Sequence, residues 1–181
     1  ITPPDEVPED MAEPMRMIGM NPDDYNGRVT EIRRDMQIFK RENDKELGRD
    51  YSELNDDQLT DDYHYYIFPN LTLNTHSDQM MMFRQRPHED DPNKMYWDLQ
   101  MFQMMPDGTE APPLPDHEQY GHGEKSVGLV LDQDSVNVPH IQKGMKSTGY
   151  DGLWINTQER RIRHMHKTLM DYINGEYAND A

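Results

Sequence analysis

Residues 63–104 constrain the fold most, because they hold three dense β-forming stretches separated by short turn signals. Residues 63–75 are rich in aromatic and β-branched side chains, and Pro69-Asn70 interrupts them, so we expect one strand with a bulge or a strand edge there. Residues 79–86 and 94–104 predict two further strands. Three consecutive strands with short connections predict an antiparallel meander.

Helices are predicted on both sides of these strands. Residues 1–60 form an irregular and helical lead-in, with a short helix around 11–17 and a longer one over 28–43. The longer helix places four apolar residues on one face, namely Val29, Ile32, Met36 and Phe39. Its opposite face carries Arg33, Arg34, Lys40 and Arg41.

The remaining C-terminal part is predicted to be a loop followed by two helices. Strands occupy 61–105, a Pro- and Gly-rich loop occupies 106–123, and the two helices within 124–175 cover about 125–146 and 157–174. Asn156 and Glu159 form a capping box, and Gly175 is placed to end the last helix. The expected buried stripe of that helix comprises Ile162, Met165, Leu169 and Ile173. The fold class is therefore α+β.

The charge of the chain excludes several classes of partner. Its 181 residues carry 18 Lys and Arg against 35 Asp and Glu, a net charge of −17. Such a chain is repelled by nucleic acid and by anionic membrane surfaces. No apolar run approaches the ~20 residues of a membrane helix, and no signal peptide opens the chain, so we expect a cytoplasmic protein.

The composition also limits the core and the metal chemistry. Hydrophobic residues make up only 34% of the chain and the mean hydropathy is −1.07. A hydrophobic content this low, with a net charge this large, is close to that of disordered proteins. We therefore expect segments or subunits outside this chain to complete the core. Cysteine is absent, which excludes disulfides, a thiolate nucleophile and Cys-ligated clusters within the chain. Any metal here would be held by His, Asp or Glu.

One carboxylate lies where the helical pattern predicts an apolar residue. The stripe of the helix over 125–146 has steps of four and three residues, and Asp134 interrupts the apolar positions Val127, Leu131, Val138, Ile141 and Met145. An ionised carboxylate that faces a core costs several kcal/mol unless a cation or several donors meet it. Asp134 could therefore aim at an internal metal, cap a helix broken at Pro139, or pair with Arg160 or Arg163. The nearby Asp132 falls off the stripe and is expected to be solvated.

Several segments, in this order and spacing, resemble one enzyme family. They are Tyr63-His64-Tyr65-Tyr66-Ile67-Phe68-Pro69-Asn70, Phe83-Arg84-Gln85-Arg86-Pro87-His88, Leu131-Asp132-Gln133-Asp134 with Gln142-Lys143-Gly144-Met145, and Glu159 with His164 and His166. Over roughly residues 10–174 the chain resembles the C-terminal catalytic region of the α subunits of Rieske non-haem iron oxygenases, which hydroxylate aromatic rings.

The resemblance implies a fold and a cofactor. The fold is the helix-grip (START/Bet v1-like) fold, an antiparallel sheet that grips a long C-terminal helix, of which residues 1–181 would be the second half. The family's mononuclear Fe(II) is held by two His and one carboxylate, and the carboxylate matches Asp134. The substrate cavity lies between sheet and helix, and the matching candidates for its lining are His64, Phe68, Asn70, Thr72 and Val138. Alternation along a strand would put Phe68, Asn70 and Thr72 on one side of the sheet.

The family also implies parts that this chain lacks. The Rieske domain with its [2Fe-2S] cluster and the two iron-binding His are missing from these 181 residues. We therefore interpret the chain as a C-terminal fragment that is inactive alone. The complete oxygenase would use O2 and an organic, most typically aromatic, substrate, for hydroxylation or dihydroxylation. It would take electrons from NAD(P)H through a ferredoxin or reductase and form a homotrimer or an α3β3 assembly.

Other histidines and other classes of protein compete with this interpretation. His117 and His122 have a His-x4-His spacing but lie in the predicted loop, where solvated residues are expected. His164 and His166 are two apart on a helix and cannot both face inward. A helix-grip module that binds a small molecule without redox chemistry predicts the same strands and helices, but no inward acid. An acidic interaction segment is a third possibility.

Overall fold

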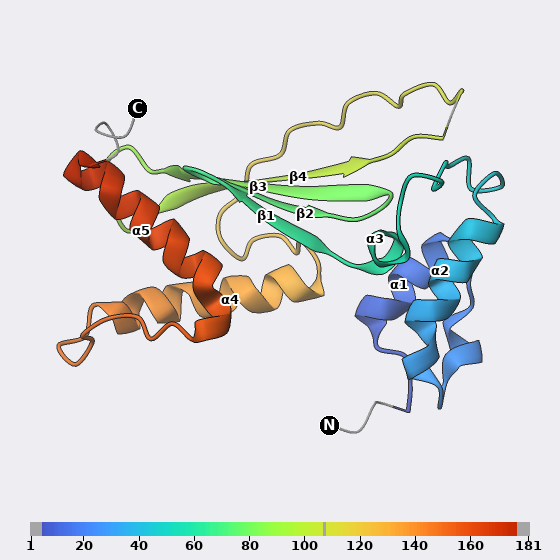
Figure 1. Cartoon of the computed structure of the whole chain (residues 1–181). Helices are drawn as coiled ribbons and strands as arrows, with labels where there is room; N and C mark the ends of the chain where they lie inside the picture. Colours follow the sequence, from blue (N-terminus) through green and yellow to red (C-terminus); the bar gives the residue numbers. More distant parts are fainter. Residues whose placement is uncertain (1–4, 107, 177–181) are drawn as a thin grey trace. The chain divides into compact units, whose positions relative to one another are not determined.

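Four antiparallel strands form one sheet in the order β1-β2-β3-β4, so each strand pairs with its neighbour in sequence (Figure 1). The strands are β1 (Tyr63–Ile67), β2 (Leu71–Thr75), β3 (Gln79–Pro87) and β4 (Met95–Gln103). The computed structural model describes residues 5–106 and 108–176. It divides into two compact units, residues 1–111 and 112–181, which are described separately below. The α+β class and the meander are confirmed.

The single strand expected over residues 63–75 is instead a hairpin. Residues 68–70 form a turn between β1 and β2, so Tyr63 pairs with Thr75 and Ile67 with Leu71. Asn70 fixes this turn against β3, because its side-chain amide donates to the Gln85 carbonyl over 2.7 Å. The expectation that Phe68 and Asn70 lie on a strand beside Thr72 is therefore wrong. Pro69 ends a strand here instead of bending one.

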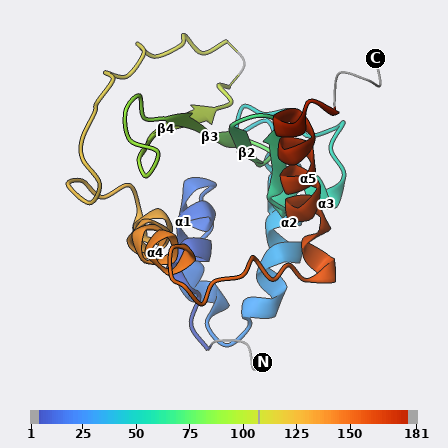
Figure 2. The ribbon, with the colours of Figure 1, turned by 90° about the vertical axis from the view of Figure 1, so that its left-hand side faces the viewer.

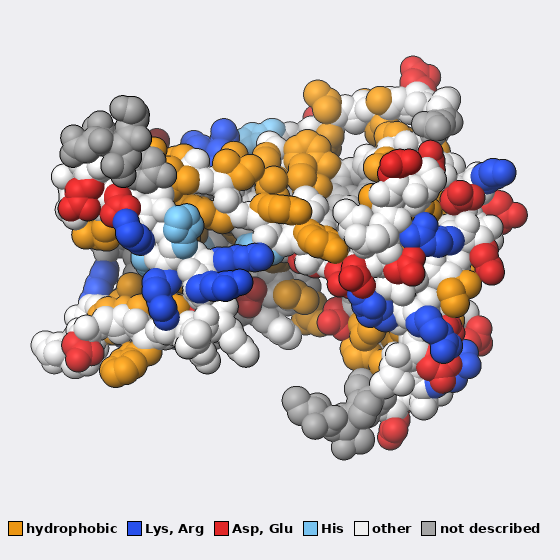
Figure 3. All heavy atoms as spheres, viewed as in Figure 1, with side chains coloured by type: hydrophobic (Ala, Val, Ile, Leu, Met, Phe, Trp, Pro, Cys, Tyr) orange, Lys and Arg blue, Asp and Glu red, His pale blue; other side chains and the backbone are white. Residues whose placement is uncertain are grey.

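The helices of the first unit are α1 (Glu9–Met17), α2 (Ile32–Glu42) and α3 (Asp56–Thr60), with short 3-10 turns at Pro22–Tyr25 and Val29–Glu31. The helices α1 and α2 lie in the same helical region, which is drawn in blue in Figures 1 and 2. A small core of Met15, Met20, Tyr25 and Ile32 lies around them. Met36 and Phe39 of α2 pack against this core, as does Val29 of the preceding 3-10 turn, so the predicted apolar residues share one side although the α-helix itself begins only at Ile32. Figure 3 shows acidic and basic side chains interspersed over this helical region.

Lys40 lies on the α2 face that was predicted to be polar, but it is buried, with 6% of its surface exposed. Its ammonium donates to the Leu59 carbonyl over 2.9 Å, to Ser77 Oγ over 2.6 Å and to Asp78 Oδ2 over 2.8 Å. The Tyr51 hydroxyl donates to the other Asp78 oxygen over 2.7 Å. These bonds join α2 and the segment before the sheet to the β2–β3 turn. Lys40 therefore lies opposite the apolar face of α2, as predicted, but is buried by segments that follow α2 in the chain.

Asp78 is the anion at the centre of this buried network. Burial raises the pKa of Asp78, but hydrogen bonds from Lys40, Tyr51 and Ser77 outweigh that effect and hold the pKa below its usual value. Arg49, whose side chain is 9% exposed, adds a second cation at 3.5 Å from Asp78 Oδ1. Asp78 is therefore ionised in the folded protein and depends on its cations for that state.

Successive residues of a strand point to opposite faces of the sheet, and paired residues on neighbouring strands point to the same face. By this rule the register gives the sheet one face that carries charged residues and one face that carries none. All three formally charged strand residues, Arg84, Arg86 and Asp98, lie on the charged face.

The hydrogen bond from Arg86, followed by that from Arg84, lowers the pKa of Asp98 to about 2. Because this folded-state pKa is depressed, the stabilisation by Asp98 is present at neutral pH. It is lost only as the pH falls through the folded value.

The second unit holds α4 (Leu129–Met145) and α5 (Arg160–Asn174), the latter preceded by a 3-10 turn at Thr157–Glu159. The helix α4 starts four residues later than the predicted Lys125. Neither helix has a buried residue in the described structure, so the expected buried stripe of α5 is not buried: Ile162 is 44% and Ile173 67% accessible, and Met165 is half-buried. This apolar surface fits the expectation that other segments complete the core.

Both predicted caps of the last helix are present. Asn156 accepts from the Gln158 amide over 3.3 Å, and Glu159 accepts from the Asn156 amide over 2.7 Å, as in a capping box. Gly175 ends the helix with φ +72°, in the left-handed region that disfavours residues with a Cβ. Both ends of α5 are therefore specified by local sequence.

We expect Gly175→Ala to lower the free energy of unfolding by about 1 kcal/mol, because Ala pays the left-handed penalty that Gly avoids. The measurement is urea denaturation of the intact protein followed by circular dichroism. Gly149→Ala is the matched control, since its φ is not positive and no atom lies within 4 Å of the added Cβ. Equal effects of the two substitutions would contradict the cap assignment.

Candidate metal centre

Asp134 lies in the first half of α4, and its side chain is exposed. The apolar residues of the same stripe are equally uncovered, with Val138 48%, Ile141 60% and Met145 50% accessible. The stripe therefore lacks a cover from Asp134 onward in the described structure, whereas Val127 and Leu131 are half-buried, so the exposure of Asp134 is not particular to the carboxylate. Neither Arg160 nor Arg163 forms an ion pair with Asp134 among the described residues.

Asp132 and Asp134 differ in what their carboxylates contact. Asp132 accepts from the Ser126 hydroxyl over 2.5 Å and from the Val127 amide over 2.9 Å, which fixes the start of α4. The Ser126 hydrogen bond, followed by that from Val127, lowers the pKa of Asp132. Asp132 is not buried, and it contributes to the helix start in addition to lying at the surface. Asp134 has no hydrogen bond or ion pair to any residue that the structure describes, so its oxygens are free to bind a cation.

The described residues contain no group of three or more His, Asp or Glu that could hold a metal ion. His117 and His122 are exposed outside helices and strands, as predicted for the loop. His164 and His166 lie on α5, and both are exposed. A carboxylate that lacks internal partners suits a hard cation such as Fe(II). This chain would then supply one ligand, and the others would have to come from elsewhere.

The five predicted pocket residues fall at three different places. His64 on β1 and Thr72 on β2 lie on the uncharged face of the sheet, because His64 pairs with Asn74 and Tyr66 with Thr72. Phe68 and Asn70 lie in the β1–β2 turn, and Val138 lies on α4 in the other unit. The structure therefore brings only His64 and Thr72 onto a common surface. Their role in binding stays a prediction.

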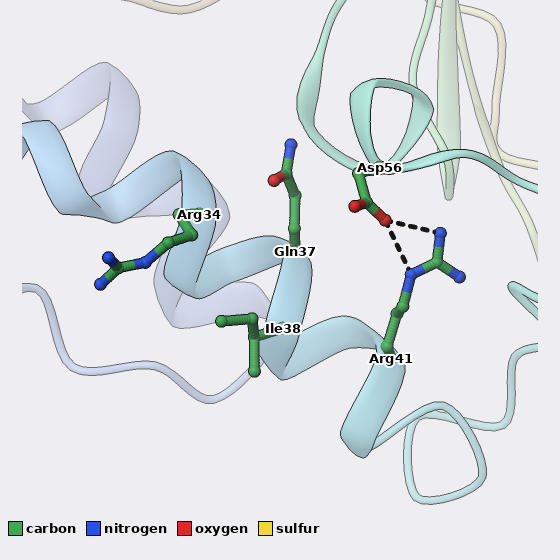
Figure 4. A pocket seen from close by; sticks show the side chains of 5 residues that line it. All are labelled: Arg34, Gln37, Ile38, Arg41 and Asp56. Carbon is green, nitrogen blue, oxygen red and sulfur yellow. Dashed lines mark hydrogen bonds and ion pairs between the residues drawn. The ribbon is translucent and has the colours of Figure 1, made fainter.

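A hollow of about 160 Å³ lies elsewhere, along α2 beside the start of α3, and is lined by Arg34, Gln37, Ile38, Arg41 and Asp56 (Figure 4). Its charged groups already have partners. Arg41 pairs with Asp56 over 2.8 Å, and Arg34 pairs with Asp35 over 2.8 Å. In Figure 4 the Arg34 side chain points away from the Arg41–Asp56 pair. No sequence-predicted site residue lines this hollow.

Sequence reasoning missed Asn74, which lies on β2 opposite His64 and Met81. Its side-chain oxygen Oδ1 is buried and has no hydrogen-bond partner among the described residues. The signal in the sequence is the spacing of Thr72 and Asn74, two polar residues that alternate with Leu71 and Leu73 along one strand. That spacing places a polar pair on one side of β2.

Comparison with known proteins identifies the family. The family model of the ring hydroxylating alpha subunit (catalytic domain) matches residues 9–175. Since the match covers most of the chain, the protein belongs to this family of ring-hydroxylating oxygenases. The sheet and the C-terminal helices are compatible with the family's helix-grip catalytic domain. Comparison with curated proteins and comparison with solved structures gave no match.

Membership in this family bears on the predicted cofactors and redox partners. Non-haem iron and a Rieske cluster are characteristic of the family, which typically works with oxygen and a ferredoxin or reductase. Among the described residues, no helix is both long and apolar enough to cross a membrane. The ring-hydroxylating assignment is thus established at the level of the catalytic domain, and the free carboxylate of Asp134 fits a non-haem iron ligand.

Proposed function

We propose that the chain is the C-terminal part of an oxygenase catalytic domain in which Asp134 is the carboxylate ligand of a mononuclear Fe(II). Two His encoded outside these residues would complete the facial set of ligands. The observation that carries this proposal is the difference between the two acids at the start of α4. Asp132 is engaged in the helix start, whereas Asp134 is free and lies on the face that the apolar residues share.

The bound iron would supply activation of O2 for hydroxylation or dihydroxylation of an organic, most typically aromatic, substrate. The residues of this chain have simpler tasks. Asp134 holds one position on the metal and offsets part of its positive charge. Val138 lies one helical turn after Asp134 and would present an apolar contact to the substrate. His64 and Thr72 would line the cavity from the uncharged face of the sheet.

The rest of the proposal concerns the complete protein. An upstream Rieske domain would carry the [2Fe-2S] cluster, and a ferredoxin or reductase would pass electrons from NAD(P)H to it. The net charge of −17 suits a cytoplasmic protein that docks redox partners through polar surfaces. A homotrimer or an α3β3 assembly would bring one subunit's cluster close to its neighbour's iron.

The proposal is tested with the intact polypeptide. We expect about one Fe per subunit beyond the cluster iron, and O2 consumption that depends on NAD(P)H, the redox partners and an aromatic compound. The chain of residues 1–181 alone should bind Fe(II) poorly in a calorimetric titration, because one carboxylate does not hold the ion. Tight stoichiometric binding by the short chain would show that His117 and His122 form a site, and would overturn the proposed ligand set.

A further inference from the structure

The uncharged face of the sheet carries a distribution of side chains that fits a ligand of a particular kind. Every strand residue with a formal charge lies on the opposite face, although charged residues make up 29% of the chain. The β1–β2 half of the uncharged face is polar and neutral. The β3–β4 half is mainly apolar, with the polar residues Gln79, Gln85 and Gln103 beside the apolar residues Met81, Phe83, Trp97, Leu99 and Met101.

The apolar half offers a surface for a flat hydrophobic body. Phe83 is 8% exposed and stacks on Trp97, with ring centroids 5.1 Å apart and planes inclined by 11°. Trp97 itself is 37% exposed and Met101 is 62% exposed. Ligand sites are predominantly apolar and use a few placed polar groups to fix orientation. An apolar ligand over β3 and β4 would therefore have its polar part over β1 and β2.

The polar half contains an acceptor that has no donor. Asn74 Oδ1 is buried without a hydrogen-bond partner among the described residues, although it lies on the central strand β2 between His64 and Met81. A buried amide oxygen without a donor costs free energy that is recovered when a donor arrives. No strand residue on this face is a Lys or Arg, so an anionic group placed there would find no permanent cation among the strand residues, and His64 is the single titratable base beside it.

We propose that the substrate is a neutral apolar molecule that carries a hydrogen-bond donor, such as a hydroxyl group, and that Asn74 Oδ1 accepts from it. This inference rests on the proposed function, because it takes the uncharged face, with His64 and Thr72, as part of the substrate cavity. It excludes carboxylates and other ionised compounds as preferred substrates. Asn74 becomes a residue that determines specificity and does not touch the metal.

The test uses three probes with one ring system and different substituents, namely 2-naphthol, 2-methylnaphthalene and 2-naphthoate. Their binding to the intact protein is measured by isothermal titration calorimetry without redox partners. We expect 2-naphthol to bind about threefold to tenfold more tightly than 2-methylnaphthalene, the range of one net hydrogen bond, and 2-naphthoate to bind most weakly. Asn74→Leu should abolish the preference for 2-naphthol and leave 2-methylnaphthalene bound at least as tightly as in the wild type.

Gln100→Leu is the matched control, because it also replaces a side-chain amide by Leu, at an exposed position on the charged face. It should leave all three affinities unchanged. Unaltered preference in Asn74→Leu, tightest binding of 2-naphthoate, or no binding of any probe would each overturn the inference. Retained 2-methylnaphthalene binding shows that the Asn74 variant is folded. The binding of the probes is measured without turnover and does not depend on iron. Loss of the iron proposal would therefore leave the measured preference for 2-naphthol valid, and absence of that preference would leave the iron proposal valid.

Discussion

Asp134→Asn is expected to remove the mononuclear iron from the intact protein and to lower oxygenation by more than about 100-fold. Loss of a residue that merely supports a metal ligand costs about 10–100-fold, so loss of the ligand itself should cost at least as much. The substitution keeps the size of the side chain and removes its charge. Iron is measured by metal analysis after anaerobic purification, and oxygenation by product formation.

Asp132→Asn is the control for this experiment, because it changes the same residue type two positions earlier on the same helix. It should weaken the hydrogen bonds from Ser126 and Val127 and so reduce stability modestly, while iron and activity persist. Asp134→Leu separates the oxygenase from a binding module without metal. The module should gain stability and keep its ligand, whereas the oxygenase should lose iron. Full iron content in Asp134→Asn would refute the assignment of this ligand.

Lys40→Met is expected to lower the free energy of unfolding of the intact protein by about 3 kcal/mol. Removal of one partner of a buried ion pair strands the other charge, which costs about 3–5 kcal/mol. The low end applies because Tyr51 and Arg49 stay in contact with Asp78, whose side chain is 21% exposed. Urea denaturation gives the free energy, and the pKa of Asp78 should rise when its nearest cation is removed.

Arg33→Met on the same helix is the control for the Lys40 variant. Arg33 pairs with Asp57 and Asp61, but its side chain is 51% exposed, and exposed ion pairs contribute about 0–1 kcal/mol. Adding Asp78→Asn to Lys40→Met should recover part of the loss, because a neutral amide is cheaper to bury than a carboxylate. Equal losses from Lys40→Met and Arg33→Met would show that the buried network does not stabilise the fold.

The sequence predicted correctly those helices and strands whose ends are set by residues close to them in the chain. The last helix was predicted with both caps, because Asn156, Glu159 and Gly175 act within a few residues of the ends they fix. The strands β3 and β4 were predicted within one residue at each end, since polar turns bound them. The hairpin at 68–70 was missed, because aromatic and β-branched residues continue on both sides of Pro69-Asn70 and hide the reversal of direction.

Contacts between distant residues could not be predicted from pattern. Lys40 follows the periodicity of a solvated helix face, and its burial depends on Asp78, 38 positions later in the chain. Asn74 Oδ1 has no hydrogen-bond partner among the described residues because it lies on the face without charged residues. Which face that is depends on the register of four strands, which the sequence pattern does not show. Asp134 was singled out by a stripe and by resemblance. Its bond to iron stays a prediction, because the described residues contain no group of His, Asp and Glu that could hold the ion.

The order of the strands bears on how the protein is made. Each strand pairs with the one synthesised just before it, across the turns at 68–70, 76–78 and 88–94. Closing such short loops loses little chain entropy, so pairing can begin while the ribosome is still adding residues. The sheet can thus be complete before translation reaches α4. Iron binding through Asp134 would then be a late event that follows the formation of the sheet.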